Sequence, residues 1–501
     1  MLVGMTAALA DPAGRTGGTP LTNKSITLEN PSKDHTYELY QIFTGTFKVV
    51  DGEDTLGDIA WGNGVTDAGK TALGTAKDVA DAITDTAAGA RAFANSIDQY
   101  LTNGSSKKAG EESLVWDNLS EGYYIIKDVT AAADLPEGDT VDLVVVQVLD
   151  NVTITAKSGT VEFDKKVADR NDSEQAPTVY DAWGNTSDYD VNDDVPYQVT
   201  IKLPANFSSY TTYQMTMHDD MEAGLSFNDD VVVTAPDGTA LTAGTDYEVK
   251  KNSNGHTFEI AFAEVVGMKG AADNAQYTIT YSAKLTGENV VYGNPGNHND
   301  AWLTYSNNPT TGGEGGTTPH KTTVTFTYKL EVDKTDGTNP LPGAEFTLEK
   351  YIKSADGGTW TPLALIKNTA GTIFTFDGLD DGFYRITETA TPAGYNSIDP
   401  IYFTVVAEHT ATLDTLVVKQ ADSEGKVLDT DKATAAFNVT LTKVGDGKDA
   451  GLIDTEVVNN QGSTLPSTGG IGTTLFYIGG GILVLAAVIL LVTKRRMNAN
   501  D

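Results

Sequence analysis

The stretch that decides the fold is a short run in which apolar and polar side chains alternate, and it reads Val161-Glu162-Phe163-Asp164-Lys165-Lys166-Val167. Successive side chains of a strand point to opposite faces, so this pattern predicts a half-buried β-strand. Its apolar face carries Lys165 and its polar face carries Lys166. The run from Tyr328 to Lys334 alternates in the same way and places Lys334 on its apolar face. A lysine directed into the core therefore opens two consecutive units.

Short alternating strands continue through both units, for example at 197–201 and 277–281, and Gly, Asp and Pro turns separate them. Regular spacing of such strands is typical of immunoglobulin-like β-sandwiches. An Ala-rich stretch with helical spacing, 68–101, interrupts the strands of the first unit. The sequence therefore predicts a mainly β protein: a first β domain with a helical insertion, followed by tandem sandwiches.

The composition narrows the possible partners. The chain has 501 residues and a net charge of −35, from 69 Asp and Glu against 34 Lys and Arg. Phosphate binding needs basic patches, so nucleic acid is not expected as a partner. Without cysteine there are no disulfides, and the six histidines show no regular metal-ligand spacing. We therefore expect neither a metal site nor a cofactor.

The C-terminus combines three features in a fixed order. They are the pentapeptide Leu465-Pro466-Ser467-Thr468-Gly469, an apolar run at 475–493 and the basic cluster 494–496. About 19 apolar residues suffice for a transmembrane helix, and the basic cluster places the C-terminus on the cytoplasmic side. An ordinary membrane anchor with a chance pentapeptide is the alternative. Residues 1–10 end in a small-x-small pattern and resemble the back half of a secretory signal, which fits an exported chain.

These patterns divide the chain into seven segments. They are a signal-peptide remnant (1–10), a flexible lead (11–24), the first β domain (25–156), a β-sandwich (160–309), a Gly/Thr linker (310–322), a second β-sandwich (323–461) and the C-terminal anchor (465–501).

Each inward lysine has an acid and an asparagine of matching strand parity. Asp219 shares its face with apolar residues of one strand, and Glu388 does so in the other unit. Asn299 and Asn459 lie on the inner face of each unit's closing strand. Burial lowers the pKa of a lysine and raises that of an acid, so a neutral amine can attack the asparagine carbonyl while the protonated acid polarises it. Ammonia leaves and a Lys–Asn isopeptide bond remains.

A buried ion pair beside an unrelated asparagine is the alternative interpretation of these patterns. In the first sandwich the choice between Asp219 and Asp220, and between Asn299 and Asn297, stays open.

Lys157 differs from the two inward lysines. Val152, Ile154 and Ala156 share the inner face of their strand, so Lys157 falls on the solvent side or just past the strand end. That position suits a nucleophile that an enzyme must reach. An ordinary exposed lysine is the alternative.

Three regions of the chain, the C-terminus and the two predicted sandwiches, resemble known families of Gram-positive surface proteins. The C-terminus resembles a cell-wall sorting signal, in which a sortase cuts between the positions of Thr468 and Gly469. The segments 191–197, 218–225 and 299–307 resemble the fimbrial isopeptide-forming domain. The segments 341–348 and 384–395 resemble the collagen-adhesin B-type domain of pilins, although Thr391 replaces the more usual alanine. The position of Lys157 resembles that of the pilin-motif lysine, with Thr155-Ala156 in place of Tyr-Pro.

The chain as a whole resembles a sortase-assembled major, or backbone, pilin. The resemblance implies a non-enzymatic structural subunit, joined through Thr468 to Lys157 of the next subunit in a wall-anchored pilus that supports adhesion. It also implies Lys165–Asn299 and Lys334–Asn459 bonds formed with Asp219 and Glu388. The implied partners are pilin-specific and housekeeping sortases, identical subunits and peptidoglycan, with minor or tip pilins and host ligands as further candidates. A monomeric wall-anchored adhesin is the main alternative, and a surface hydrolase lacks a recognisable catalytic set.

Overall fold

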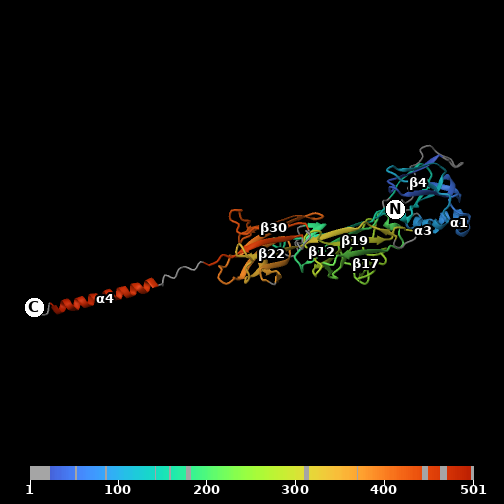
Figure 1. Ribbon diagram of the computed structural model, residues 1–501. Coiled ribbons are helices and arrows are strands. Elements are labelled where there is room, and N and C mark those ends of the chain that lie inside the picture. Colours follow the sequence, from blue (N-terminus) through green and yellow to red (C-terminus); the bar gives the residue numbers. More distant parts are fainter. Residues whose placement is uncertain are drawn as a thin grey trace.

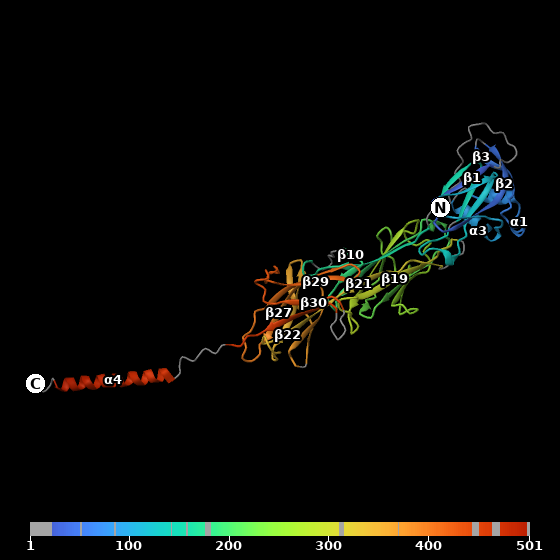
Figure 2. The ribbon, with the colours of Figure 1, turned by 45° about the horizontal axis from the view of Figure 1, so that its top comes forward.

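A computed structural model describes residues 23–50, 53–84, 87–141, 143–156, 159–175, 182–309, 315–368, 370–442, 450–462 and 471–497. Figure 1 shows three units in a row along one long axis, with the helix α4 (Ile471–Met497) beyond the third unit. The turned view of Figure 2 shows the same arrangement. Within α4, Phe476–Arg495 is long and apolar enough to cross a membrane, and none of it is buried. This agrees with the expected C-terminal span.

The first unit contains two sheets and a helical layer. Its elements are β1 (Lys24–Glu29), β2 (Thr36–Val50), β3 (Glu53–Trp61), α1 (Asp67–Leu73), α2 (Ala76–Ala82), α3 (Ala87–Ile97), η1 (Asp98–Tyr100), β4 (Ser105–Lys108), β5 (Leu114–Leu119), β6 (Gly122–Asp128), η2 (Ala132–Asp134), β7 (Leu143–Val148) and β8 (Val152–Thr155). One sheet has the order β5-β1-β8, and the other has the order β3-β2-β6-β7 with β4 beside β2.

The larger sheet of the first unit is covered on both faces. Tyr124 and Ile126 of β6 pack toward the smaller sheet. Ile125, between them in sequence, packs with Phe93 and Ile97 of α3. Alternate side chains of β6 therefore pack into two different hydrophobic cores, one on each face of the sheet. The predicted helical insertion is confirmed, although it is three short helices, the first ending at Gly74 (φ +100°).

The second unit is a sandwich of two sheets. Its elements are β9 (Glu162–Asp169), β10 (Ala182–Gly184), β11 (Thr186–Asp188), β12 (Asp194–Lys202), η3 (Phe207–Ser209), β13 (Met215–Met221), β14 (Leu225–Phe227), β15 (Val232–Thr234), β16 (Glu248–Lys251), β17 (Phe258–Phe262), β18 (Gln276–Leu285), β19 (Asn297–Tyr305), β20 (Gly316–Thr317) and β21 (Lys321–Phe326). One sheet follows the order β10-β9-β12-β18-β14, with β15 beside β18. The other follows the order β11-β21-β19-β13-β17-β16, with β20 beside β19.

The third unit is a sandwich of two five-stranded sheets. Its strands are β22 (Tyr328–Thr335), β23 (Glu345–Ser354), β24 (Gly357–Pro362), β25 (Leu365–Lys367), β26 (Ile373–Leu379), β27 (Gly382–Ala390), β28 (Ile401–His409), β29 (Leu413–Ala421), β30 (Phe437–Thr440) and β31 (Leu452–Val458). The sheet orders are β25-β26-β22-β31-β30 and β24-β23-β27-β28-β29. The third unit begins later than residue 323, because β21 still pairs with β19 of the second unit.

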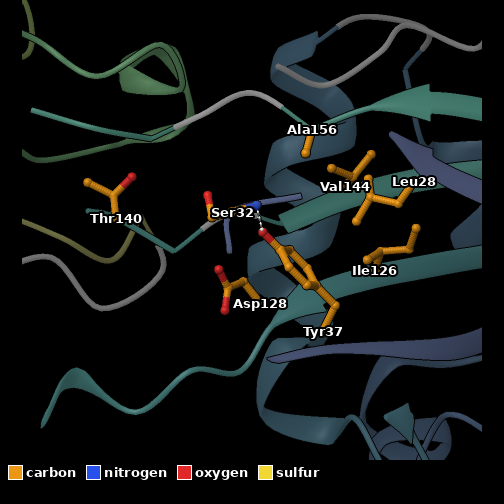
Figure 3. Close-up of a pocket in the computed structure, with 8 residues that line it drawn as sticks. All are labelled: Leu28, Ser32, Tyr37, Ile126, Asp128, Thr140, Val144 and Ala156. Atoms are coloured by element: carbon orange, nitrogen blue, oxygen red, sulfur yellow. Dashed lines mark hydrogen bonds between the residues drawn. The ribbon is translucent and has the colours of Figure 1, made fainter. Parts of the chain in front are cut away.

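The junction of the first two units is polar and hydrogen-bonded. Thr140 donates to the side chain of Asn206, and the backbone N–H of Val141 donates to Asn307. Figure 3 shows Thr140 and Ala156 among the residues that line a cavity of about 10 Å³, room for about one water molecule. The chain therefore passes from Ala156 into the second unit beside a fixed contact between the two units.

The junction of the second and third units centres on one buried lysine. Lys350 of β23 is 1% exposed, and its Nζ lies 2.5 Å from Asp172 and 3.0 Å from Asp190, both of the second unit. It also contacts Asp380 of its own unit. Burial disfavours the ammonium, but the surrounding carboxylates outweigh it and raise the pKa of Lys350 well above its usual value. Lys350 therefore remains charged and joins the two units electrostatically.

Replacing Lys350 by methionine should loosen this junction. The change leaves buried carboxylates without their cation, and breaking a buried ion pair in this way costs about 3–5 kcal/mol. Calorimetry should show a lower melting temperature, and small-angle scattering should show a wider distribution of shapes. Lys353→Met, on an exposed position of the same strand, is the matched control. Equal melting and scattering in both variants would contradict the role of Lys350.

Candidate isopeptide-forming sites

The alternation predicted for the two opening strands is confirmed by burial. Lys165 is 1% exposed, and Lys334 is 0% exposed. Asp219, Asn299 and Asn459 are each 0% exposed. Only the acid of the third unit, Glu388, is partly accessible.

In the second unit the site lies between the two sheets. Lys165 projects from β9 of one sheet, and its Nζ lies 3.0 Å from Oδ2 of Asp219 on β13 of the other. Asn299 reaches the same place because Ala301 pairs with Asp219 across the ladder and Asn299 is two residues away on the same face. Tyr281 of β18 donates to Asp219 and accepts from Nδ2 of Asn299 at 3.5 Å.

The electrostatics of this site favour neutral groups. Burial lowers the pKa of Lys165, although the charge of Asp219 opposes the shift. Burial also raises the pKa of Asp219, against the influence of Lys165 and of the hydrogen bond from Tyr281. Both shifts favour a neutral amine beside a protonated acid, which is the state that nucleophilic attack on an amide requires.

The neighbouring candidates have other contacts. The side-chain oxygen of Asn297 accepts from the backbone N–H of Val291. Its side-chain nitrogen donates to the backbone carbonyls of Val291 and Thr325. Asp220 is half-exposed and pairs with His256. The geometry therefore favours Asp219 and Asn299 over Asp220 and Asn297.

In the third unit the lysine and asparagine lie in the same sheet. Lys334 of β22 pairs with Val457 of the parallel strand β31, and Asn459 lies two residues beyond Val457 on the same face. Nζ of Lys334 donates to the backbone carbonyls of Thr335 (2.7 Å) and Val457 (3.1 Å). Burial lowers the pKa of Lys334 although Glu388 opposes the shift.

Glu388 of β27 reaches this pair from the opposite sheet. Its Oε2 accepts from Nδ2 of Asn459 at 3.0 Å, and that nitrogen is the atom that would leave as ammonia. Thr391 also donates to Oε2 of Glu388, at 3.0 Å. The departure from the usual alanine at this position thus adds a hydrogen bond to the candidate acid.

Both sites contain buried oxygens that have no hydrogen-bond partner among the described residues. They are Oδ1 of Asp219, Oδ1 of Asn299, Oε1 of Glu388 and Oδ1 of Asn459. A buried acceptor without a donor is costly, so each site has a physical reason to hold an extra proton. A proton on the acid would supply the missing donor and could activate the amide carbonyl for attack.

Some features of the sites were missed in the sequence. The sequence predicts a strand at 277–281 but does not indicate that Tyr281 contacts the candidate acid. Its alternation with Tyr277 and Ile279, which are buried in the same core, could have shown that it points inward. Tyr197 pairs with Tyr281 across the ladder between β12 and β18. Nζ of Lys165 lies 5.5 Å from the centre of the Tyr197 ring. Lys157 and the pentapeptide 465–469, which includes Thr468, lie outside the described residues. The inner face that precedes Lys157 is confirmed, because Val152 and Ile154 are buried.

Three family models match this chain. Residues 191–309 match the Gram-positive pilin backbone subunit 2, Cna-B-like domain. Residues 328–419 match a prealbumin-like fold domain, and residues 457–499 match the LPXTG cell wall anchor motif. The chain therefore contains a pilin backbone domain, a prealbumin-like domain and a Gram-positive cell wall anchor motif, which confirms the family resemblance inferred from the sequence.

The chain is also similar to single proteins of known sequence or structure. The trypsin-resistant surface T6 protein of Streptococcus pyogenes serotype M6 is 24% identical over 365 residues, and the match covers 60% of this chain and 64% of that protein. The solved T6 backbone pilin has a TM-score of 0.53 at 17% identity, over 88% of this chain and 99% of the other. The major pilin SpaD of Corynebacterium diphtheriae gives 0.47 at 19% identity, over 88% and 98%. The T6 match supports the modular three-unit fold.

If both bonds form, the mature protein should weigh less than its sequence predicts by two molecules of ammonia. Intact-mass spectrometry of the folded protein measures this deficit. Asp219→Ala should restore one ammonia and Glu388→Ala the other, because each removes the proton shuttle of one site. Asp220→Ala is the control for Asp219 and should leave the mass deficit unchanged. A tryptic peptide carrying free Lys334 from the wild-type protein would refute the bond in the third unit.

Lys334→Ala should destabilise the third unit strongly. The bond would close a loop of more than a hundred residues, and the chain-entropy model assigns about 4–5 kcal/mol to such a closure. We expect a lower melting transition and trypsin sensitivity in the third unit, with the second unit little changed. Lys419→Ala, at an exposed position of β29, is the control. Unchanged melting and protease resistance in Lys334→Ala would show that Lys334 is not cross-linked.

Proposed function

We propose that the chain is the backbone subunit of a covalent pilus on the wall of a Gram-positive bacterium. The observation that carries this proposal is the presence, in one chain, of a pilin backbone domain and a cell wall anchor motif. The three units in a row give the subunit the extended shape that a filament needs. The work of such a subunit is structural, and each internal bond forms only once.

Polymerisation would proceed by two acyl transfers. A sortase cysteine attacks the carbonyl of Thr468, breaks the bond to Gly469 and holds Thr468 as a thioester. The amine of Lys157 from another subunit then attacks this thioester, forms the new amide and releases the enzyme. Because the two reacting ends differ, the contact is heterologous and continues into a filament.

The position of Lys157 supports its role as the acceptor. It follows Ala156, whose backbone N–H donates to Glu29, and precedes Gly159, which packs against Thr140. The acceptor would therefore lie between two fixed points, at the junction of the first two units. Wall anchoring would use the same thioester with a peptidoglycan amine as the acceptor.

The internal bonds would form without an enzyme. Nζ of Lys165 attacks Cγ of Asn299, the C–N bond of the amide breaks and ammonia leaves with a proton passed through Asp219. Lys334, Asn459 and Glu388 would act in the same way in the third unit. No cofactor is required, since proximity in a dry core supplies the rate.

Lys157→Ala should abolish polymerisation and leave wall anchoring intact. Wild-type wall extracts, boiled in detergent and immunoblotted, should show a ladder of high-mass species that the variant reduces to monomer. Lys166→Ala is the control, because Lys166 lies on the solvent-facing side of β9, and we expect its loss to leave the ladder unchanged. An unchanged ladder in Lys157→Ala would move the linkage to another lysine. Absence of a ladder in the wild type would favour a monomeric wall-anchored adhesin.

A further inference from the structure

Four of the six histidines lie in the second unit, on or beside the outer face of the sheet that contains β13, β17, β19 and β21. They are His218, His256, His298 and His320. Each contacts a carboxylate within 3.1 Å, and three of them also contact the ring of Trp302. This face is opposite the buried Lys165–Asp219 pair, so the isopeptide chemistry makes no use of it.

His218, His256 and Glu259 form the centre of this group. One ligand atom of each lies within 4.8 Å of the other two. His218 and Glu259 are direct partners across the β13–β17 ladder, and His256 precedes β17 in the adjoining turn. Their side chains are 13%, 22% and 4% exposed for His218, His256 and Glu259, so the group is sheltered but open to an ion from solution.

The hydrogen bonds of His218 determine which of its ring nitrogens carries the lone pair, and that nitrogen faces the carboxylate of Glu259. The hydroxyl of Thr304 donates to the backbone carbonyl of Thr216 at 3.4 Å, so it accepts from Nε2–H of His218 at 3.0 Å. In the neutral ring, Nδ1 then carries the lone pair, and it faces Oε1 of Glu259 at 2.9 Å. Two acceptors at that distance repel each other unless a cation, either a proton or a metal ion, joins them.

The second histidine is oriented in a complementary way. Nδ1 of His256 lies 3.1 and 3.2 Å from the two oxygens of Asp220, so it carries the proton and leaves the lone pair on Nε2. Histidines that bind metals usually donate their other ring nitrogen to a carboxylate or a similar acceptor. His256 with Asp220, and His218 with Thr304, follow this arrangement.

The rings are held by aromatic packing. Trp302 stacks on His218, with ring centroids 5.1 Å apart, and on His320 at 4.1 Å. The rings of Trp302 and His256 are T-shaped, with centroids 5.1 Å apart. Asn254 donates to both oxygens of Glu259, at 3.2 and 3.0 Å. A ligand set whose side chains are already fixed loses little entropy when an ion binds.

We propose that His218, His256 and Glu259 bind a divalent transition-metal ion of the zinc class. Two imidazoles and one carboxylate are a ligand set suited to Zn²⁺, and water can fill the fourth position. The sequence did not predict the site, because its ligands come from two strands and a turn. It is independent of polymerisation and of the internal bonds.

Isothermal titration of the untagged full-length chain in detergent with Zn²⁺ tests the proposal. We expect one ion per chain, with affinity at least about tenfold weaker in His256→Ala, because a ligand is lost. His298→Ala is the matched control, since His298 pairs with Glu222 outside the ligand set, and it should bind as the wild type does. No binding by the wild type, equal binding by His256→Ala, or equal loss in both variants would overturn the site.

Fluorescence gives a second measurement that does not depend on heat. Cu²⁺ bound beside Trp302 should quench part of the tryptophan emission at one equivalent. That component should be absent in Trp302→Phe and require excess Cu²⁺ in His256→Ala. Quenching that persists unchanged in Trp302→Phe would place the ion elsewhere and overturn the assignment. Melting of metal-free His256→Ala at the wild-type temperature would show that the loss of binding is not a loss of fold.

Discussion

A fully buried lysine amine is the constraint on which the two sandwiches depend. An ammonium in a dry core is costly unless it is paired or neutralised, and both Lys165 and Lys334 have pKa values lowered by burial. Strand register then decides what surrounds each amine. In both units an asparagine lies two residues from a directly paired position, on the same face. An amide bond would remove the charge permanently, so the core would no longer have to solvate it.

Lys350 shows the opposite outcome for a lysine that is buried to the same extent. It has carboxylates from two units around it, and their combined charge outweighs burial, so its pKa rises instead of falling. Lys165 has one directly bonded acid, Asp219, whose own pKa is raised by burial. The number of nearby acids thus separates a candidate nucleophile from a structural cation. Burial alone does not distinguish the two roles.

Much of the candidate sites follows from the sequence, because strand alternation is a local property. The inward positions of Lys165, Lys334, Asp219 and Asn459 needed only the parity of their own strands. Contacts made by distant segments could not be found in this way. Lys350 lies on the inner face of an ordinary alternating strand, and only the docking of the second unit surrounds it with Asp172 and Asp190. The boundary near residue 323 was misplaced for the same reason, since pairing with β19 is a tertiary choice.

The two proposed bonds would also determine how tension passes along the subunit. Force applied between Lys157 and Thr468 enters the second unit through β9, where Lys165 lies, and leaves the third through β31, just before Asn459. Each bond would bear that force directly. The hydrogen bonds between the strands of the same sandwich would then not be loaded. The stretch from Asn299 to Lys334 has no such bypass. Its resistance would depend on the pairing of β21 with β19 and β11, and on the Lys350 junction beside it. If both bonds form, the pairing of β21 and the electrostatic contact at Lys350 are therefore the non-covalent interactions that oppose extension of this stretch.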